Sequence, residues 1–104
     1  MSGRGMPLVN AQKCIQALED TSSHTRVAAA KALCGLKDPM AVKPLTVALR
    51  DRNPSVRKAA AESLGEMKDP HAIGPLTKAL RDEVDDVRDA AAHALDKIRD
   101  RNKH

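Results

Sequence analysis

The chain repeats itself with a period of 31 residues. The segment AVKPLTVALRD at Ala41 returns at Ala72 as AIGPLTKALRD, which is 31 positions later. In the same way VRKAAAESL at Val56 returns at Val87 as VRDAAAHAL, and a weaker copy, TRVAAAKAL, stands at Thr25. Periods of about 20 to 50 residues indicate stacked supersecondary units. We expect three copies, at about residues 10–40, 41–71 and 72–102.

Apolar residues within a copy are spaced for α-helices. Val42, Leu45 and Leu49 recur at steps of three and four, and Val56 opens a second stripe with the same spacing. This spacing places the apolar side chains on one face of each helix. Each copy is therefore expected to be two antiparallel helices, which makes six helices in an all-α chain.

Two prolines stand close to the start of the first helix of their copies, Pro44 and Pro75. Proline costs little only in the opening turn of a helix. We therefore expect the helix either to begin late, nearer Ala41 and Ala72, or to be kinked at the proline. The Asp-Pro pair at Asp38 is typical of a capped helix start just before it.

The middle copy, DPMAVKPLTVALRDRNPSVRKAAAESLGEMKDP, resembles the short HEAT repeats of the phycobilisome-lyase-like class. The resemblance extends over most of the chain. It implies an α-solenoid, a superhelix of three HEAT-like helix pairs, with first helices on the convex side and second helices lining the concave side. The expected organisation is a short flexible tail, 1–9, and a single repeat domain, 10–104.

An aspartate and an arginine stand six residues apart at one register of every copy. In HEAT-repeat proteins similar residues hydrogen-bond within and between neighbouring repeats, so the resemblance implies a structural ladder here. A partly buried guanidinium needs such a carboxylate partner. The alternative is that these arginines contact a ligand. The ladder residues are Asp20, Arg26, Asp51, Arg57, Asp82 and Arg88.

No motif for catalysis, metal binding or cofactor binding is present. The four histidines form no HExxH motif, and no glycine-rich phosphate loop occurs. Certain HEAT-like hydroxylases bind iron through His-Glu pairs, and the chain has no His-Glu dipeptide. Aromatic residues are absent, so bases and flat cofactors have no stacking platform. We predict no enzyme activity, no cofactor and no metal site.

The chain carries no recognisable targeting signal. No apolar run is long enough to span a bilayer, and no secretion signal is recognisable. We therefore expect a cytoplasmic protein without a membrane partner. In that compartment the two cysteines, Cys14 and Cys34, are expected to be reduced, buried thiols rather than a disulfide.

The exposed stripe of the second helices is the predicted partner-binding site. Its charges alternate in sign and differ between copies, whereas tracking a phosphate backbone needs one sign. Nucleic acid is therefore disfavoured despite the net charge of +4. The main hypothesis is a protein-binding scaffold or adaptor that presents this concave face to a protein. The predicted contact residues are Lys31, Lys58, Glu62, Glu66, Asp89, His93 and Lys97.

Two alternatives stay open. The first is a self-assembling protein, such as a homodimer through its end faces, or an accessory subunit of a larger HEAT-type complex, including a phycobilin-lyase-like assembly. It rests on the apolar register of the third copy, where Ile98 is the proposed interface residue. The second is a weak anionic or nucleic-acid partner along a basic edge formed by Arg50, Arg52 and Arg81.

Overall fold

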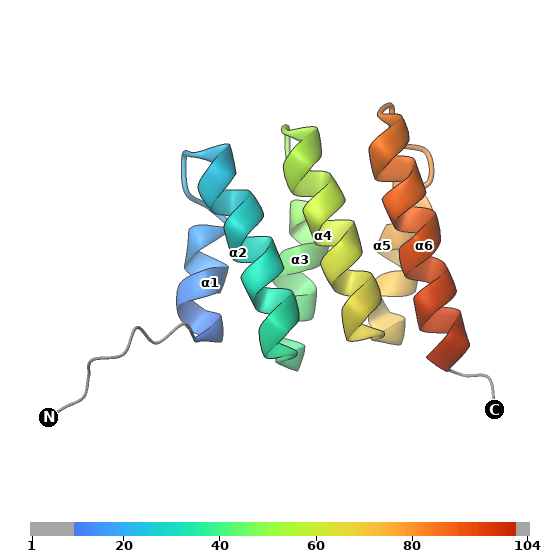
Figure 1. Cartoon of the computed structure of the whole chain (residues 1–104), viewed down its shortest axis with the longest axis horizontal. Coiled ribbons are helices and arrows are strands. Elements are labelled where there is room, and N and C mark those ends of the chain that lie inside the picture. The colour runs from blue at the N-terminus through green and yellow to red at the C-terminus, as the bar shows by residue number, and fades with distance from the viewer. Residues whose placement is uncertain (1–9, 102–104) are drawn as a thin grey trace, which may run out of the picture.

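The computed structural model describes residues 10–101, and in this part of the chain the regular structure is entirely helical (Figure 1). The predicted all-α class with six helices is confirmed. The tail predicted for 1–9 lies outside the described residues. The α-helices are α1 (Ala11–Ala17), α2 (Ser23–Leu36), α3 (Val42–Ala48), α4 (Pro54–Met67), α5 (Ile73–Ala79) and α6 (Asp85–Arg101), with 3-10 turns η1 (Pro39–Ala41) and η2 (Pro70–Ala72) before α3 and α5.

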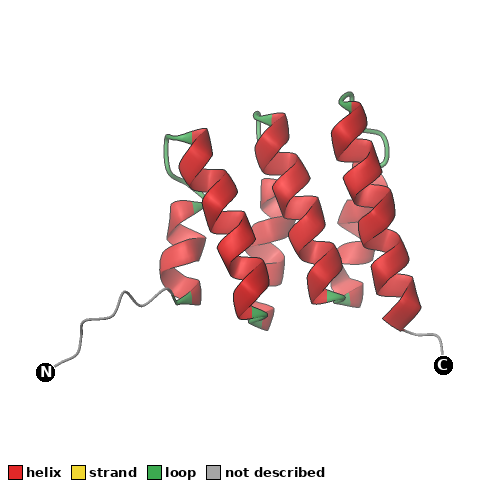
Figure 2. Ribbon diagram, in the orientation of Figure 1, coloured by secondary structure: helices red, strands yellow, loops and turns green. Residues whose placement is uncertain are grey.

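The helices form two layers. The second helices of the repeats, α2, α4 and α6, lie side by side in one layer, and the first helices, α1, α3 and α5, form the other layer behind them (Figure 1). Short loops join the layers at both ends of the helices (Figure 2). Each repeat is thus one antiparallel helix pair, and the pairs follow one another along the longest axis of the molecule.

Both prolines in question lie in the opening turn of a late-starting helix. Pro44 is the third residue of α3, and Pro75 is the third residue of α5. The amide groups of this turn have no partner within the helix, so proline loses nothing there. The late start, the first of the two expectations, is therefore what the structure shows, and the residues before it form the 3-10 turns.

Helix ends are set by local chemistry. The Ser22 hydroxyl accepts a hydrogen bond from the Thr25 amide at 3.4 Å, and the Asn53 side chain accepts one from the Ser55 amide at 2.8 Å. At the other end, Lys37 terminates α2 with a left-handed backbone, φ 53°, and Lys68 terminates α4 with φ 56°. Such residues commonly end helices, although glycine is the residue that suits them best.

Small side chains let the second helices approach one another closely. Ala30 and Ala61 are fully buried, and a Cβ added to Gly65 would lie 2.7 Å from the Cα of Ala94 on α6. First helices, by contrast, contact chiefly their own partner helix and the adjacent 3-10 turns. Among the described residues the second helices thus make the closer contacts between repeats, and the concave side implied by the resemblance stays a prediction.

Candidate partner-binding face

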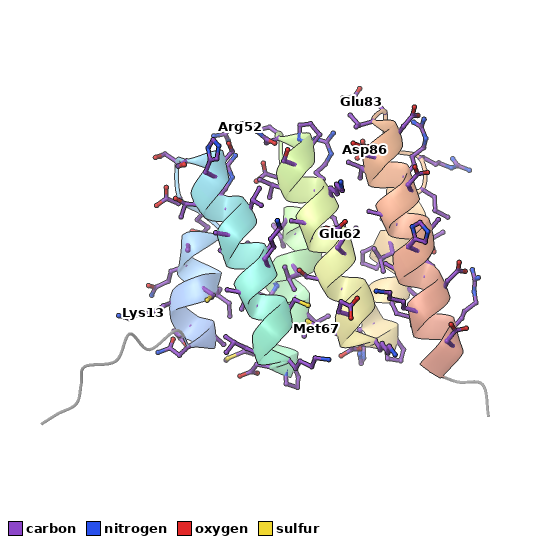
Figure 3. The ribbon with its side chains drawn as sticks, in the orientation of Figure 1. Lys13, Arg52, Glu62, Met67, Glu83 and Asp86 are labelled. Carbon is purple, nitrogen blue, oxygen red and sulfur yellow. The ribbon has the colours of Figure 1, made fainter. Side chains whose placement is uncertain are left out.

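All seven predicted contact residues are exposed and lie on the second helices. We call them the charged stripe. Figure 3 shows one member, Glu62, on the middle helix of this layer. By helix, the stripe is made of Lys31 on α2, Lys58, Glu62 and Glu66 on α4, and Asp89, His93 and Lys97 on α6.

One ion pair ties the stripe together across two repeats. Lys97 on α6 donates a hydrogen bond to the carboxylate of Glu66 on α4. This contact lowers the pKa of Glu66 and raises the pKa of Lys97, and Glu62 contributes to the second effect. Opposite charges on neighbouring helices therefore meet on this face. Such a surface suits a partner that also carries both signs of charge.

A cysteine lies beside the stripe, although the sequence did not indicate it as part of this face. Cys34 is half-buried on α2 and lies near Ser63 of α4, whose hydroxyl donates a hydrogen bond to the Ala30 carbonyl at 2.7 Å. Burial raises the pKa of this thiol, and the neighbouring Glu66 carboxylate raises it further. No sequence signal could have shown this, because residues 34 and 63 meet only when the repeats stack. Cys14, the other free thiol, is buried.

The predicted ladder is present, and its strong contacts run between repeats. Arg26 donates two hydrogen bonds to the Asp51 carboxylate, at 2.9 and 3.1 Å. Arg57 does the same to Asp82, at 2.8 and 3.2 Å. Within a repeat, the arginine binds the main chain of its aspartate instead, as Arg57 does at the Asp51 carbonyl (2.7 Å).

The ladder arginines of the first two repeats are structural. Arg26 is 4% exposed and Arg57 is 9% exposed. The hydrogen bonds that they make are internal, which favours the ladder interpretation over a ligand contact, although Arg57 also lines the cleft between α3 and α5. Burial, the largest single effect, disfavours the charged form of Asp51 and Asp82, but the arginine hydrogen bonds, a backbone amide bond and the nearby arginine charges together outweigh it and lower the pKa of both carboxyl groups.

Two residues of the predicted basic edge lie along two clefts between the first helices, whereas the third, Arg81, is exposed and lines neither cleft. Arg50 and Arg52 line both clefts, one of about 680 Å³ between α3 and α5 and one of about 1030 Å³ between α1 and α3. Arg52 and Glu83 lie at the same end of the molecule, in the turns that lead into second helices (Figure 3). Because Glu83 lines the first cleft and Glu19 the second, the edge is mixed in charge.

One prediction about the end faces is wrong. Ile98 is fully buried, as are its neighbours in the apolar register, Ala91 at 0%, Ala94 at 2% and Leu95 at 5% exposure. These side chains pack inside the molecule, so they form no open surface. The apolar register of a repeat marks its core and says nothing by itself about its outer edge.

Two further properties of the chain bear on function. Among residues 10–101, no group of three or more His, Cys, Asp or Glu side chains is arranged to hold a metal ion. Within the same described range, no helix combines the length and the apolar character needed to span a bilayer.

The geometry defines a class of protein: an α-solenoid built of stacked antiparallel helix pairs. The particular family is shown by its sequence model. The model for HEAT repeats matches residues 11–96, and the chain belongs to the HEAT-repeat family. A search among curated proteins gave no match.

Two solved structures are similar to this chain over nearly its whole length. Human deoxyhypusine hydroxylase in complex with glycerol has a TM-score of 0.82 and 29% identity over 86% of this chain. The complex of CpcE and CpcF of phycocyanin lyase from Nostoc sp. PCC7120 has a TM-score of 0.82 and 26% identity over 94%. The match spans only 32% and 40% of those chains, respectively.

Proposed function

We propose that this protein is a binding scaffold that presents the charged stripe to a protein partner. The observation that carries the proposal is the contrast between the two sides of the second helices. The buried side repeats with small apolar residues, whereas the exposed side changes its charge from repeat to repeat. A stacked array offers such a surface already formed, so binding costs little ordering entropy.

Charge reversal on the stripe tests the proposal. The variant carrying both Lys58→Glu and Glu62→Lys keeps the net charge and changes only its arrangement on α4. We expect it to lose the partners that the unchanged protein captures from its own cell extract, with affinities then measured by calorimetry. The matched control carries Glu19→Lys and Lys43→Glu, two exposed residues that line the cleft between first helices. Loss of the partner in the control but not in the stripe variant would sink the proposal.

The thiol of Cys34 offers an independent readout. Because Cys34 lies beside Glu66 and Lys97, a partner on the stripe should slow its alkylation. Buried Cys14 serves as the internal reference, since its alkylation reports opening of the fold. A partner that binds with unchanged Cys34 alkylation would be bound elsewhere on the molecule.

A second candidate is an accessory subunit of a larger HEAT-type assembly. The similarity to the two-protein complex of phycocyanin lyase favours it, since 94% of this chain matches there. The partner would then itself be a HEAT-repeat protein. Identification of the captured protein by mass spectrometry distinguishes the two candidates.

A further inference from the structure

The Arg–Asp ladder is incomplete at both edges of the array. Its rule is that the arginine of one repeat holds the aspartate 25 positions later, as Arg26 holds Asp51 and Arg57 holds Asp82. Among the described residues no arginine holds Asp20 in this way, and Arg88 holds no aspartate of a following repeat. One edge thus exposes an acceptor of the ladder, and the opposite edge exposes a donor.

The acceptor at the first edge is already arranged for an arginine. The Asp20 carboxylate accepts a hydrogen bond from the Ser22 amide at 2.9 Å. Asp51 and Asp82 accept the equivalent bond from the amide two residues later, at 2.8 and 2.9 Å, while they also bind an arginine. The same turn therefore holds all three carboxylates, and Asp20 needs no rearrangement to receive a guanidinium.

The donor at the last edge is also positioned. Arg88 donates to the Asp82 carbonyl, as the other ladder arginines do at their own turns. Its guanidinium also forms an ion pair with Asp85, three residues earlier on α6, whose side chain is 82% exposed. An exposed pair of this kind contributes at most about 1 kcal/mol. Arg88 is 40% exposed there and remains open to a better carboxylate.

Apolar positions that stacking buries elsewhere are open at the same two edges. At the last edge Ile73 is 38% and Leu80 is 37% exposed, whereas their counterparts one repeat earlier, Val42 and Leu49, are 8% and 6% exposed.

At the first edge, Leu36 is 40% exposed, whereas Ile98 at the same position of the third repeat is fully buried. Ala28 is exposed there too, and its counterpart Ala59 is 3% exposed. The two edges thus resemble the two halves of an internal repeat contact.

We propose that the last repeat of one copy stacks on the first repeat of a second copy, head to tail, with Arg88 paired to Asp20 of the second copy. Each ladder arginine of the first two repeats binds the aspartate of the next repeat, 25 positions later. Counted in periods of 31 residues, the aspartate that would follow Arg88 in this way corresponds to Asp20 of a second copy. A second copy in register therefore places its Asp20 where the rule requires an aspartate. Charge complementarity and this register select a second copy as the occupant. The contact is heterologous, so it extends into short rows rather than closing as a symmetric dimer.

One residue opposes the stacking and limits its strength. Asp96 on α6 stands where Gly65 stands on α4 and Cys34 on α2, at the closest approach between second helices. In register it would face Ala32 of the second copy. Enclosing this carboxylate and its exposed ion pair with Arg99 costs free energy. Asp96→Gly should therefore tighten the association, by about tenfold or more.

Sedimentation velocity of the whole reduced chain, over about a hundredfold range of concentration at low salt, tests the proposal. We expect the average mass of the unchanged protein and of Asp96→Gly to rise with concentration. Arg88→Glu alone and Asp20→Arg alone should remain monomeric, because each brings two like charges together at the contact. An equimolar mixture of the two variants should associate again. A contact between the two different variants can form in two ways. Either the introduced glutamate of one meets the introduced arginine of the other, or the original Arg88 of one meets the original Asp20 of the other.

Controls separate this contact from loss of fold and from other surfaces. Lys58→Glu makes the same charge change as Arg88→Glu on the charged stripe, and it should leave the association unchanged. Circular dichroism checks that each variant retains its helices. The proposal is overturned if Asp96→Gly stays monomeric throughout, if Arg88→Glu associates like the unchanged protein, or if the mixture fails to associate. None of these outcomes bears on partner binding by the stripe, which uses other residues.

Discussion

Arg57 of the second repeat holds Asp82 of the third through two hydrogen bonds of 2.8 and 3.2 Å. The same guanidinium donates to the Asp51 carbonyl in its own repeat, at 2.7 Å. One buried side chain therefore fixes the turn of its own helix pair and the position of the next pair. Because nearest-neighbour contacts stabilise solenoids, the ladder helps to hold the charged stripe in place.

Arg57→Met should destabilise the protein much more than Arg88→Met. The first change leaves the Asp82 carboxylate largely buried without its cation, which we expect to lower the free energy of unfolding by about 2–4 kcal/mol. The second removes an arginine whose ion pair with Asp85 is exposed, and about 1 kcal/mol or less is expected. Urea denaturation measures both. Equal losses of stability in the two variants would show that the hydrogen bonds from Arg57 to Asp82 between repeats do not stabilise the protein.

The ladder also predicts sensitivity to acid. Because the pKa values of Asp51 and Asp82 are lower in the folded protein than in the unfolded chain, the ionised pairs stabilise the fold above the unfolded value of about 3.9. This contribution is full above roughly pH 5 and is lost as the pH falls through the folded pKa. The free energy of unfolding should therefore fall as the pH drops below about 5 and through the lowered pKa values of the folded protein.

Asp82→Asn provides the control for the acid prediction. Its amide oxygen can still accept the Val84 amide bond that Asp82 makes at 2.9 Å, but it carries no charge. The difference in free energy of unfolding between this variant and the unchanged protein should be largest near neutral pH and should shrink below about pH 4. A difference that does not vary with pH would contradict the assigned shift.

Gly65→Ala should destabilise the contact between the second and third repeats. The added Cβ would lie 2.7 Å from the Cα of Ala94 and 2.8 Å from its Cβ, so the helices must move apart. We expect a loss of about 1–3 kcal/mol in spite of the better helix propensity of alanine. In Gly35→Ala, the control, the Cβ meets nothing within 4 Å. That variant should be as stable as the unchanged protein or more stable by up to about 1 kcal/mol, by thermal denaturation.

Much of this architecture could be predicted from the sequence, because each repeat uses the same local signals. The period of 31 residues predicts the number of helix pairs, and Pro44 and Pro75 leave two possibilities, a late start or a kink, of which the structure shows the late start. The exposure of the charged stripe followed from helical spacing alone. These features depend on residues close together in the chain.

Features that depend on stacking could not be derived in the same way. The spacing of six between Asp51 and Arg57 indicates one turn, yet the carboxylate that Arg57 binds lies 25 residues further on. Ile98 has the register of an internal repeat, and only the packing of α6 shows that it is buried. The meeting of Cys34 with Ser63 likewise depends on the distance between helices.

Substitution by glycine should change the stability in opposite directions at two equivalent repeat positions, Lys37 and Arg99. Lys37 ends α2 in the left-handed region, φ 53°, where a side chain is strained and glycine is not. Lys37→Gly should therefore raise the free energy of unfolding by about 0.5–1 kcal/mol. Arg99 stands at the same repeat position, but α6 continues through it to Arg101.

Arg99→Gly should accordingly lower stability by up to about 1 kcal/mol, because it places glycine inside a helix and removes the ion pair with Asp96. Chemical denaturation of both variants, with helix content followed by circular dichroism, compares the two directly. If Lys37→Gly also lost stability, the left-handed residue could not be what ends α2. The helix would then have to be ended by the Asp38–Pro39 pair that follows, since the residue before a proline is disfavoured in the helical region.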